Sequence, residues 1–264
     1  MIDAHAHLTD RRFADDLDAV LERARSSGVQ RVLTAAEDLR SSEDAIAVAA
    51  AHREVRVAVG VHPHRAATWS DEAAGRLREL ARAEAVVAIG EIGMDFSGRS
   101  PPPDVQERAL RGQIALAAGL GLPIVLHVRE SGARVREILR ESTAGESAGD
   151  GSPVRGMVHC YSEGPAELED WLRLGFLVSF AGTLTYPGSD QLREAAAGVP
   201  ADRLLAETDA PYLAPQHVRG RRNEPLYVAA VHATLAHLRQ ADFAELVRDL
   251  AANARFLFGK RWGT

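Results

Sequence analysis

Short apolar runs alternate along the chain with longer segments that have a helical pattern. The eight apolar runs span residues 2–5, 31–36, 55–60, 86–91, 123–127, 156–159, 176–180 and 203–207. The run 123–127 is apolar almost throughout, as a strand buried on both faces requires, whereas a half-exposed strand would alternate apolar and polar residues. We therefore predict eight parallel strands.

The segments between these runs carry signals for the starts of helices. Residues 104–107 and 242–245 have the spacing of a capping box, in which an acidic N-cap residue is followed three positions later by Glu. Pro165 and Pro225 suit the first turn of a helix, where a backbone N–H is not needed. Strand and helix are thus expected to alternate along the whole chain.

Eight such units can close into a (β/α)8 barrel of the TIM type, an α/β fold, whereas an open sheet would leave two unpaired edges. The 264 residues fit one barrel and no shift in composition marks a second domain, so we predict a single domain over residues 1–264. The Gly- and Ser-rich segment 142–153 is expected to be a mobile loop without a function.

Composition limits the partners of this protein. Hydrophobic residues make up 46% of the chain and aromatic residues only 5%, so aliphatic side chains should fill the core. No run of about 18 apolar residues is present, so we expect no membrane span. The net charge of −6 argues against broad binding of duplex nucleic acid. The single cysteine, Cys160, and the lack of a secretory leader after Met1 favour a cytoplasmic protein, and no obligate protein partner is indicated.

The first apolar run leads into two histidines, His5 and His7, that are two residues apart. Side chains at this spacing lie on the same face of a strand, and imidazole is the commonest metal ligand. Two histidines on the surface near a terminus are the alternative for this motif by itself.

Four more potential ligands decide between these alternatives. They lie at or just past the carboxyl ends of the fourth, fifth, sixth and eighth predicted strands, and in a barrel these ends converge on one rim where active sites are built. We therefore predict one metal centre. Its ligands are His5, His7, Glu91, His127, His159 and Asp209.

Six ligands exceed what one structural zinc ion needs, and a carboxylate can bridge two ions about 3.5–4 Å apart in a hydrolytic site. We expect Glu91 to be that bridge. The expected partition is His5, His7 and Asp209 around one ion, and His127 and His159 around the other. Imidazole ligands favour Zn²⁺ or Mn²⁺, and the carboxylates are also compatible with Mg²⁺.

Two further carboxylates, Glu207 and Asp95, lie near the same rim. Metal-bound imidazoles usually donate their second N–H to such a group, so we expect both residues to orient the histidine ligands. Cys160 follows a predicted ligand directly and is expected to be a buried, inert thiol that points away from the metals.

Seven motifs follow one another along nearly the whole chain. They are Asp3-Ala-His5-Ala-His7-Leu8, Gly60-Val-His62-Pro63-His64, Gly90-Glu91-Ile-Gly93-Met-Asp95, Leu126-His127-Val-Arg129-Glu130, His159-Cys-Tyr-Ser162, Glu207-Thr-Asp209-Ala-Pro211-Tyr212 and Arg222-Asn-Glu-Pro225. In content and order they resemble the TatD family of metal-dependent deoxyribonucleases, within the amidohydrolase-like superfamily. Met94 stands where Leu is more usual, a change that conserves volume.

The resemblance implies a (β/α)8 fold, one to two or more divalent cations, and hydrolysis of DNA phosphodiesters, often from the 3′ end of single strands. It also implies that His62, Ser162 and Arg222 bind substrate. The chemistry that fits is attack by a water that a cation has activated, with Asp209 as the candidate general base and Glu91 fixing the cations. Arg222 could hold a phosphate through a bidentate fork.

Two other functions stay open. One is an amidohydrolase that cleaves an amide, lactone or aminoacyl ester with the same activated water. Glu91 replaces the modified Lys that many binuclear amidohydrolases use as a bridge, and the motif at 222–225 favours the nuclease family. The other is a noncatalytic metal-binding protein, but structural metal sites are usually closed and four-coordinate, whereas this ligand set leaves positions open for water and substrate.

Overall fold

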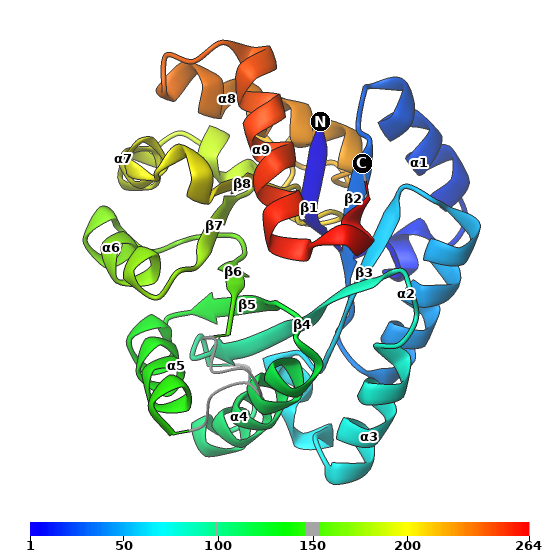
Figure 1. Ribbon diagram of the computed structural model, residues 1–264. Coiled ribbons are helices and arrows are strands. Elements are labelled where there is room, and N and C mark those ends of the chain that lie inside the picture. Colours follow the sequence, from blue (N-terminus) through cyan, green and yellow to red (C-terminus); the bar gives the residue numbers. More distant parts are fainter. Residues whose placement is uncertain (99, 146–153, 264) are drawn as a thin grey trace.

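A computed structural model describes residues 1–98, 100–145 and 154–263, in which eight parallel strands form one sheet in sequence order (Figure 1). The strands are β1 Ile2–Ala6, β2 Arg31–Ala35, β3 Val55–Val59, β4 Val86–Asp95, β5 Ile124–Arg129, β6 Gly156–Val158, β7 Leu177–Phe180 and β8 Leu204–Ala206. Each predicted apolar run overlaps one of them, and β1, β4 and β5 extend past the predicted ends. The runs are buried because helices cover the sheet, as parallel sheets require.

The sheet closes on itself where the chain leaves β8 and meets β1. The N–H of Asp209 donates to the carbonyl of His5 at 2.9 Å, and the N–H of His7 donates to the carbonyl of Ala210 at 2.7 Å. These bonds continue the parallel pattern from the last strand to the first. The predicted (β/α)8 barrel is confirmed.

Helices follow the strands around the outside of the barrel (Figure 1). They are α1 Leu17–Ser26, α2 Leu39–Ala51, α3 Asp71–Leu80, α4 Pro103–Leu120, α5 Gly132–Gly145, α6 Pro165–Arg173, α7 Asp190–Gly198, α8 Val228–Leu238 and α9 Phe243–Phe258. Short 3-10 helices lie between them: η1 Arg11–Phe13, η2 Pro63–Thr68, η3 Gly182–Thr185, η4 Ala201–Arg203, η5 Gln216–Val218, η6 Pro225–Tyr227 and η7 Lys260–Trp262.

The predicted helix starts are partly right. Pro165 is the first residue of α6, and the side chain of Asp242 caps α9 by accepting from the N–H of Glu245 at 3.0 Å. Pro225 begins η6, one short turn before α8. The capping box predicted at 104–107 is wrong, because α4 already begins at Pro103 and Asp104 lies inside its first turn.

The first four residues of the loop predicted at 142–153 are helical. Residues 142–145 form the last turn of α5, which ends at Gly145. Residues 146–153 lie outside the described part of the chain. Among the described residues, no helix combines the length and the apolar character that crossing a membrane needs.

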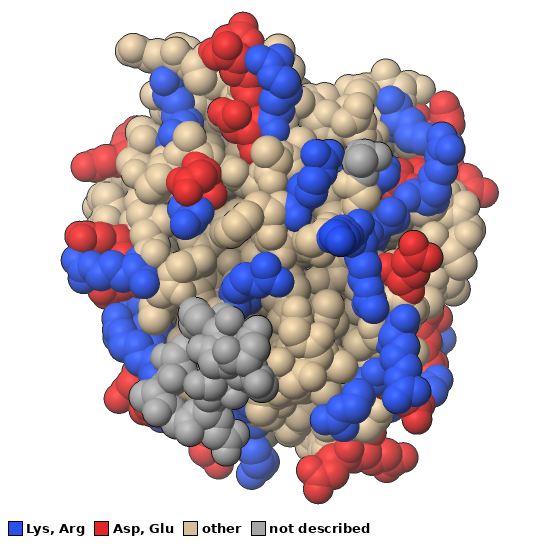
Figure 2. All heavy atoms as spheres, in the orientation of Figure 1, with Lys and Arg blue, Asp and Glu red and all other residues tan. Residues whose placement is uncertain are grey.

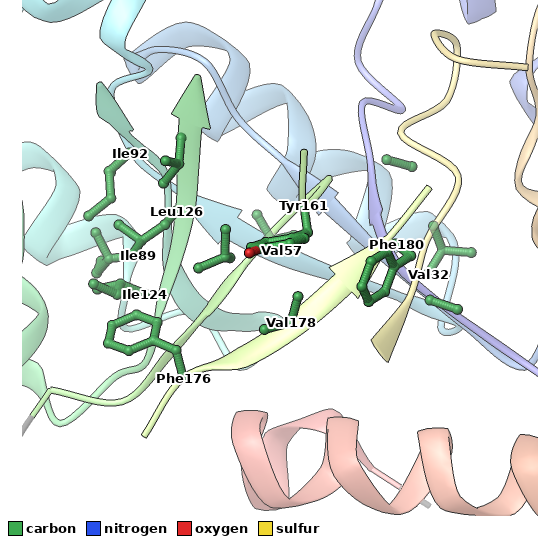
Figure 3. Close-up of a cluster of buried hydrophobic side chains, with 14 of the residues drawn as sticks. Val32, Val57, Ile89, Ile92, Ile124, Leu126, Tyr161, Phe176, Val178 and Phe180 are labelled. Carbon is green, nitrogen blue, oxygen red and sulfur yellow. The ribbon is translucent and has the colours of Figure 1, made fainter. Parts of the chain in front are cut away.

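The core is mainly aliphatic, as the composition predicted, with a few aromatic side chains such as Phe176 and Phe180 buried in it. One large cluster joins the strands to the surrounding helices, and Val32, Val57, Ile89, Leu126 and Val178 are among its members (Figure 3). Burial of such side chains contributes roughly 1.5–3 kcal/mol each before the entropy of folding is subtracted. This cluster therefore fixes the strands from which the site residues project.

A second buried cluster joins the strands to α9 and η7. It includes Val125 and Leu205, which stand two residues before His127 and Glu207 and so share their face of the strand. An apolar layer thus lies directly beneath the polar side chains at the carboxyl ends of the strands.

The opposite, amino-terminal end of the barrel is covered by the end of the chain. Arg31 is the first residue of β2 and donates to the carbonyl of Trp262 at 3.1 Å. Arg56 is the second residue of β3 and donates to the carbonyl of Arg261 at 2.6 Å. Figure 2 shows this face, with several Lys and Arg side chains near its middle. These basic side chains are therefore remote from the carboxyl ends of the strands.

Candidate metal centre

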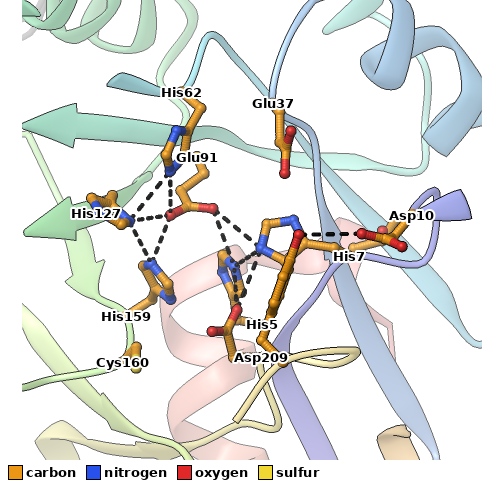
Figure 4. Close-up of polar contacts among 12 residues, drawn as sticks. His5, His7, Asp10, Glu37, His62, Glu91, His127, His159, Cys160 and Asp209 are labelled. Carbon is orange, nitrogen blue, oxygen red and sulfur yellow. Dashed lines mark hydrogen bonds and ion pairs between the residues drawn. The ribbon is translucent and has the colours of Figure 1, made fainter. Parts of the chain in front are cut away.

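Six polar side chains from five strand ends meet at the carboxyl-terminal end of the barrel (Figure 4). Five of them are buried, and His127 is the most exposed, with 17% of its side chain accessible. They are the six predicted ligands, His5, His7, Glu91, His127, His159 and Asp209. The structure brings them together although up to 204 positions separate them in sequence.

An irregularity in β4 directs Glu91 into this cluster. Ile89 and Ile92 are three residues apart, yet both lie in the large apolar cluster, and the register between β4 and β5 shifts between them. A regular strand would place residues three apart on opposite faces. The shift keeps both isoleucines in the core and turns Glu91 inward.

Two special backbone positions complete the frame. Gly93 has φ +148° and approaches β5 so closely that a Cβ atom there would lie 1.9 Å from the carbonyl oxygen of His127. Only glycine fits at this point. Asp209 has φ +57°, a left-handed conformation that Asp tolerates better than most residues. That conformation turns its carboxylate back toward His7.

The two oxygens of Glu91 face different sets of imidazoles. Oε1 lies 2.7 Å from both His127 Nδ1 and His159 Nε2. Oε2 lies 3.4 Å from His5 Nε2 and 3.5 Å from His7 Nε2. One carboxylate thus stands between two groups of nitrogen donors.

Asp209 completes the group on the side of His5 and His7. Its Oδ1 lies 3.3 Å from His7 Nε2 and 3.7 Å from His5 Nε2, and these two nitrogens are 3.2 Å apart. The ring of His5 also stacks on that of His159, with centroids 3.9 Å apart. The two halves of the site are therefore in direct contact.

The carboxylates of the cluster are held in their ionised form. Burial by itself would raise the pKa of Glu91, but the surrounding imidazoles, above all His159 and His62, hold that pKa well below its usual value. The pKa of Asp209 is likewise lowered against burial, chiefly by a hydrogen bond from His7. Burial also opposes charge on His7, but Asp209 and Glu91 raise the pKa of that imidazole to about 9. Protons on imidazole thus balance the buried negative charge.

This donor set fits divalent cations. Within the described ranges, three overlapping groups have ligand atoms within 4.8 Å of one another: His5, His7 and Glu91; His5, His159 and Asp209; and His62, Glu91 and His127. Among the described residues, Glu91 Oε2 is buried and has no hydrogen-bond partner. A cation could replace the imidazole protons, which metal binding releases, and satisfy this oxygen.

Comparison with known proteins identifies the family. A family model described as TatD related DNase matches residues 2–259. The chain belongs to the TatD family. The resemblance seen in the seven motifs is confirmed, and with it an enzyme that hydrolyses ester bonds.

Relatives of this TatD-family chain match it from end to end. A protein of Erwinia amylovora named 3'-5' ssDNA/RNA exonuclease TatD is 40% identical over 265 residues, which cover 98% of this chain and 100% of the relative. A Bacillus subtilis protein named Uncharacterized metal-dependent hydrolase YabD is 35% identical over 258 residues, 98% of either chain. The crystal structure of YJJV, a TatD homolog from Escherichia coli, has a TM-score of 0.89 at 30% identity and covers 98% of this chain and 97% of its own.

One histidine predicted to bind substrate lies inside the cluster of this TatD-family site. His62, expected only to bind substrate, has its Nε2 3.3 Å from Glu91 Oε1 and 3.4 Å from His127 Nδ1. It lies among the potential ligands. Its position just after β3 was the available signal, since the other candidates follow strands in the same way.

Glu37 is a carboxylate near the cluster that the sequence motifs did not single out. This residue follows β2, and Figure 4 shows its side chain near the cluster. Its charge contributes to raising the pKa of His7. The same rule that selected the other ligands, a polar residue just past a strand, would have found it.

The two predicted orienting carboxylates contact imidazoles of the cluster. Glu207 Oε1 lies 3.2 Å from His159 Nδ1 and also accepts from the N–H of Cys160 at 2.8 Å. Asp95 Oδ2 lies 3.4 Å from His127 Nε2 and 2.8 Å from His64 Nε2. In His159 and in His127 alike, the carboxylate contacts the ring nitrogen that faces away from Glu91.

The other two predicted substrate residues lie outside the cluster. Ser162 is exposed, three residues past His159. Arg222 is engaged in a bidentate pair with Asp16, at 2.7 Å for both bonds, and also donates to Glu224 at 2.9 Å. Its guanidinium fork is therefore occupied by carboxylates.

Cys160 has φ +44°, so strand alternation does not determine where its side chain points. The expectation that it points away from the metals rested on that alternation. The residue is also only partly buried, not fully buried as expected. Burial, with Asp209, Glu207 and Glu91 nearby, raises the pKa of its thiol well above the ordinary value. A protonated thiol is a poor nucleophile, as the sequence-based expectation of an inert cysteine requires.

Proposed function

We propose that this TatD-family hydrolase is a 3′–5′ exonuclease that acts on single-stranded DNA with two divalent cations, Zn²⁺, Mn²⁺ or Mg²⁺. The observation that carries this proposal is the position of Glu91, whose two oxygens each face a separate set of imidazoles. Such an arrangement suits a carboxylate that bridges two ions.

The residues that would hold the cations follow from these distances. His5, His7 and Asp209 would hold one ion with Glu91 Oε2, and His127 and His159 the other with Oε1. When bound, the cations would supply Lewis-acid chemistry, because they polarise a phosphoryl group and lower the pKa of water toward about 7.

Asp209 is the candidate general base. Its side chain is 12% exposed and that of Glu91 only 1%, so Asp209 is the carboxylate of the cluster that water reaches more easily. The hydrogen bond from His7 lowers the pKa of Asp209 and so keeps it ionised, the form in which a carboxylate can accept a proton.

Other residues would orient the site and bind the substrate. Glu207 and Asp95 would fix the rings of His159 and His127, because each contacts the ring nitrogen opposite the one that faces Glu91. We assign Ser162 to substrate binding, and we assign His62 to substrate binding from within the ligand cluster, where its Nε2 lies 3.3 Å from Glu91 Oε1.

Arg222 joins the substrate-binding residues only if a phosphate displaces Asp16 from its guanidinium.

The substrate assignment draws on two observations. The Erwinia amylovora relative that carries the name 3'-5' ssDNA/RNA exonuclease shares the full length of the chain. The buried position of Glu91 also favours a single strand, whose terminal phosphodiester enters a recessed site more easily than a duplex does. The single cysteine fits a reducing compartment, and we place the activity in the cytoplasm.

The test is a cleavage assay with 5′-labelled single-stranded DNA, duplex DNA and RNA, before and after chelation and re-addition of Mn²⁺, Zn²⁺ or Mg²⁺. We expect stepwise shortening from the 3′ end that requires a cation and is lost in Glu91→Ala and Asp209→Ala. The control is Asp202→Asn, a change at an exposed carboxylate on η4. Full activity of either site variant would overturn the assignment, and cleavage of amides or lactones instead of DNA would favour an amidohydrolase.

A further inference from the structure

An exposed aromatic ring stands beside the candidate metal centre. Among the described residues, three large apolar side chains are exposed: Tyr212 at 40%, Phe243 at 43% and Phe256 at 61%. Phe243 and Phe256 belong to α9, whereas Tyr212 follows β8 and its ring lies 5.8 Å from the ring of His7. Tyr212 is therefore the exposed aromatic residue that a molecule bound at the metal centre would meet.

The ring of Tyr212 is held in place from several sides. Its hydroxyl donates to Asp10 Oδ2 at 3.2 Å, and the guanidinium of Arg12 lies over the ring, 4.1 Å from its centroid. Asn223 Nδ2 donates to the backbone carbonyl of Tyr212 at 2.6 Å. The ring is thus fixed with one face against Arg12, while 40% of the residue stays exposed.

Arg12 is fixed in the same way. Its Nε and Nη2 donate to the two oxygens of Asp10 at 2.9 and 2.8 Å, and the carbonyl of Arg12 accepts from Arg222. These contacts hold the guanidinium plane against Tyr212 while about 40% of the Arg12 side chain remains exposed. Two flat groups, one aromatic and one cationic, are therefore presented together beside His7.

We propose that Tyr212 and Arg12 form a stacking platform for a nucleobase next to the scissile phosphodiester, so that the site prefers nucleotides to phosphodiesters without bases. Every base has a flat π face, and both aromatic rings and Arg guanidinium planes stack on it without regard to sequence. A phosphate at the cluster leaves its base one sugar away, and the exposed ring of Tyr212 lies at that range, 5.8 Å from the ring of His7. The platform rests on the proposed function, because it needs a nucleic acid at this site.

A structural role is the competing explanation for Tyr212. The ring would then only cover His7 and anchor η1 through Asp10, and its removal would lower stability or activity on every substrate alike. Stacking differs because it acts only when a base is present.

The test compares two single-stranded oligonucleotides that are identical except that one is abasic at both nucleotides flanking the 3′-terminal phosphodiester. We measure kcat/KM on each in the presence of Mn²⁺ for the wild type, Tyr212→Phe, Tyr212→Leu and Tyr212→Ala. The matched control is Phe256→Ala, which removes an exposed aromatic ring from α9. Thermal melting of each variant checks that the fold is intact.

We expect Tyr212→Ala and Tyr212→Leu to lower kcat/KM on the base-bearing strand about 5- to 150-fold, the range for the loss of one stacked base, and to leave the abasic strand within about twofold. Tyr212→Phe and Phe256→Ala should behave as the wild type does. An equal loss on both strands, or no loss on either, would overturn the platform while leaving the exonuclease intact. Failure of the wild type to cleave either strand would overturn the proposed function and the platform with it.

Discussion

Replacing Glu91 by Gln keeps the size of the side chain and removes the one charge that both halves of the candidate metal centre share. The carboxylate is buried, with imidazole nitrogens 2.7 Å from one oxygen and 3.4–3.5 Å from the other. Removing one partner from such a buried charge pair typically costs about 3–5 kcal/mol. We therefore expect each ion to bind Glu91→Gln at least about 100-fold more weakly than the wild type.

Thermal melting makes this loss visible. A free ion at about 1,000 times its dissociation constant stabilises the folded state by roughly 4 kcal/mol per site. For a chain of this size that corresponds to a rise in Tm of about 8–16 °C per site. The chelated wild type should show this rise when Mn²⁺ or Zn²⁺ is added back, and Glu91→Gln should lose nearly all of it.

The assay pairs melting curves with metal analysis of the dialysed protein. Glu169→Gln, at an exposed carboxylate on α6, is the matched control and should bind metal and melt like the wild type. The reasoning would be refuted if Glu91→Gln kept two ions per chain and the full rise in Tm.

Three further changes test separate parts of the account. Asp209→Asn should lower kcat about 10²- to 10⁴-fold by removing the general base while an ion remains bound beside His127, and unchanged kcat in steady-state kinetics would contradict this. Burial holds the pKa of His232 near 4, below the usual 6.5, so the unfolded chain takes up its proton first. The contribution of His232 to the free energy of unfolding should therefore be complete above about pH 6.5 and fall by about 3 kcal/mol toward pH 4. In urea titrations, His232→Gln should reduce this fall in stability with decreasing pH. An unchanged fall would exclude His232 as its origin. Arg222→Ala should lower Tm, because Arg222 ties its loop to Asp16, and an unchanged Tm with a raised KM for DNA would instead support a phosphate-binding role.

The sequence predicted the fold and the six clustered residues by one argument. Parallel strands that close into a barrel bring their carboxyl ends together, so polar residues just after apolar runs become neighbours. His127 and His159 are examples, because each lies at the end of a short buried run whose length and composition identify it as a strand.

Features that depend on contacts between strands did not follow from the pattern. The run at 86–91 was expected to end at Glu91, but β4 continues to Asp95 because the register shift and Gly93 let it stay paired with β5. The ion pair of Arg222 was also not predictable, since its partner Asp16 lies 206 residues earlier in the sequence. Ion pairs of this kind depend on tertiary packing, which apolar periodicity does not encode.

The most direct test of the central claim is anomalous diffraction from crystals of the protein grown with Mn²⁺. The account predicts two anomalous peaks about 3.5–4 Å apart on either side of the Glu91 carboxylate, one beside His7 and Asp209 and one beside His127. A single peak, or peaks that do not contact Glu91, would contradict a two-ion centre built around this residue.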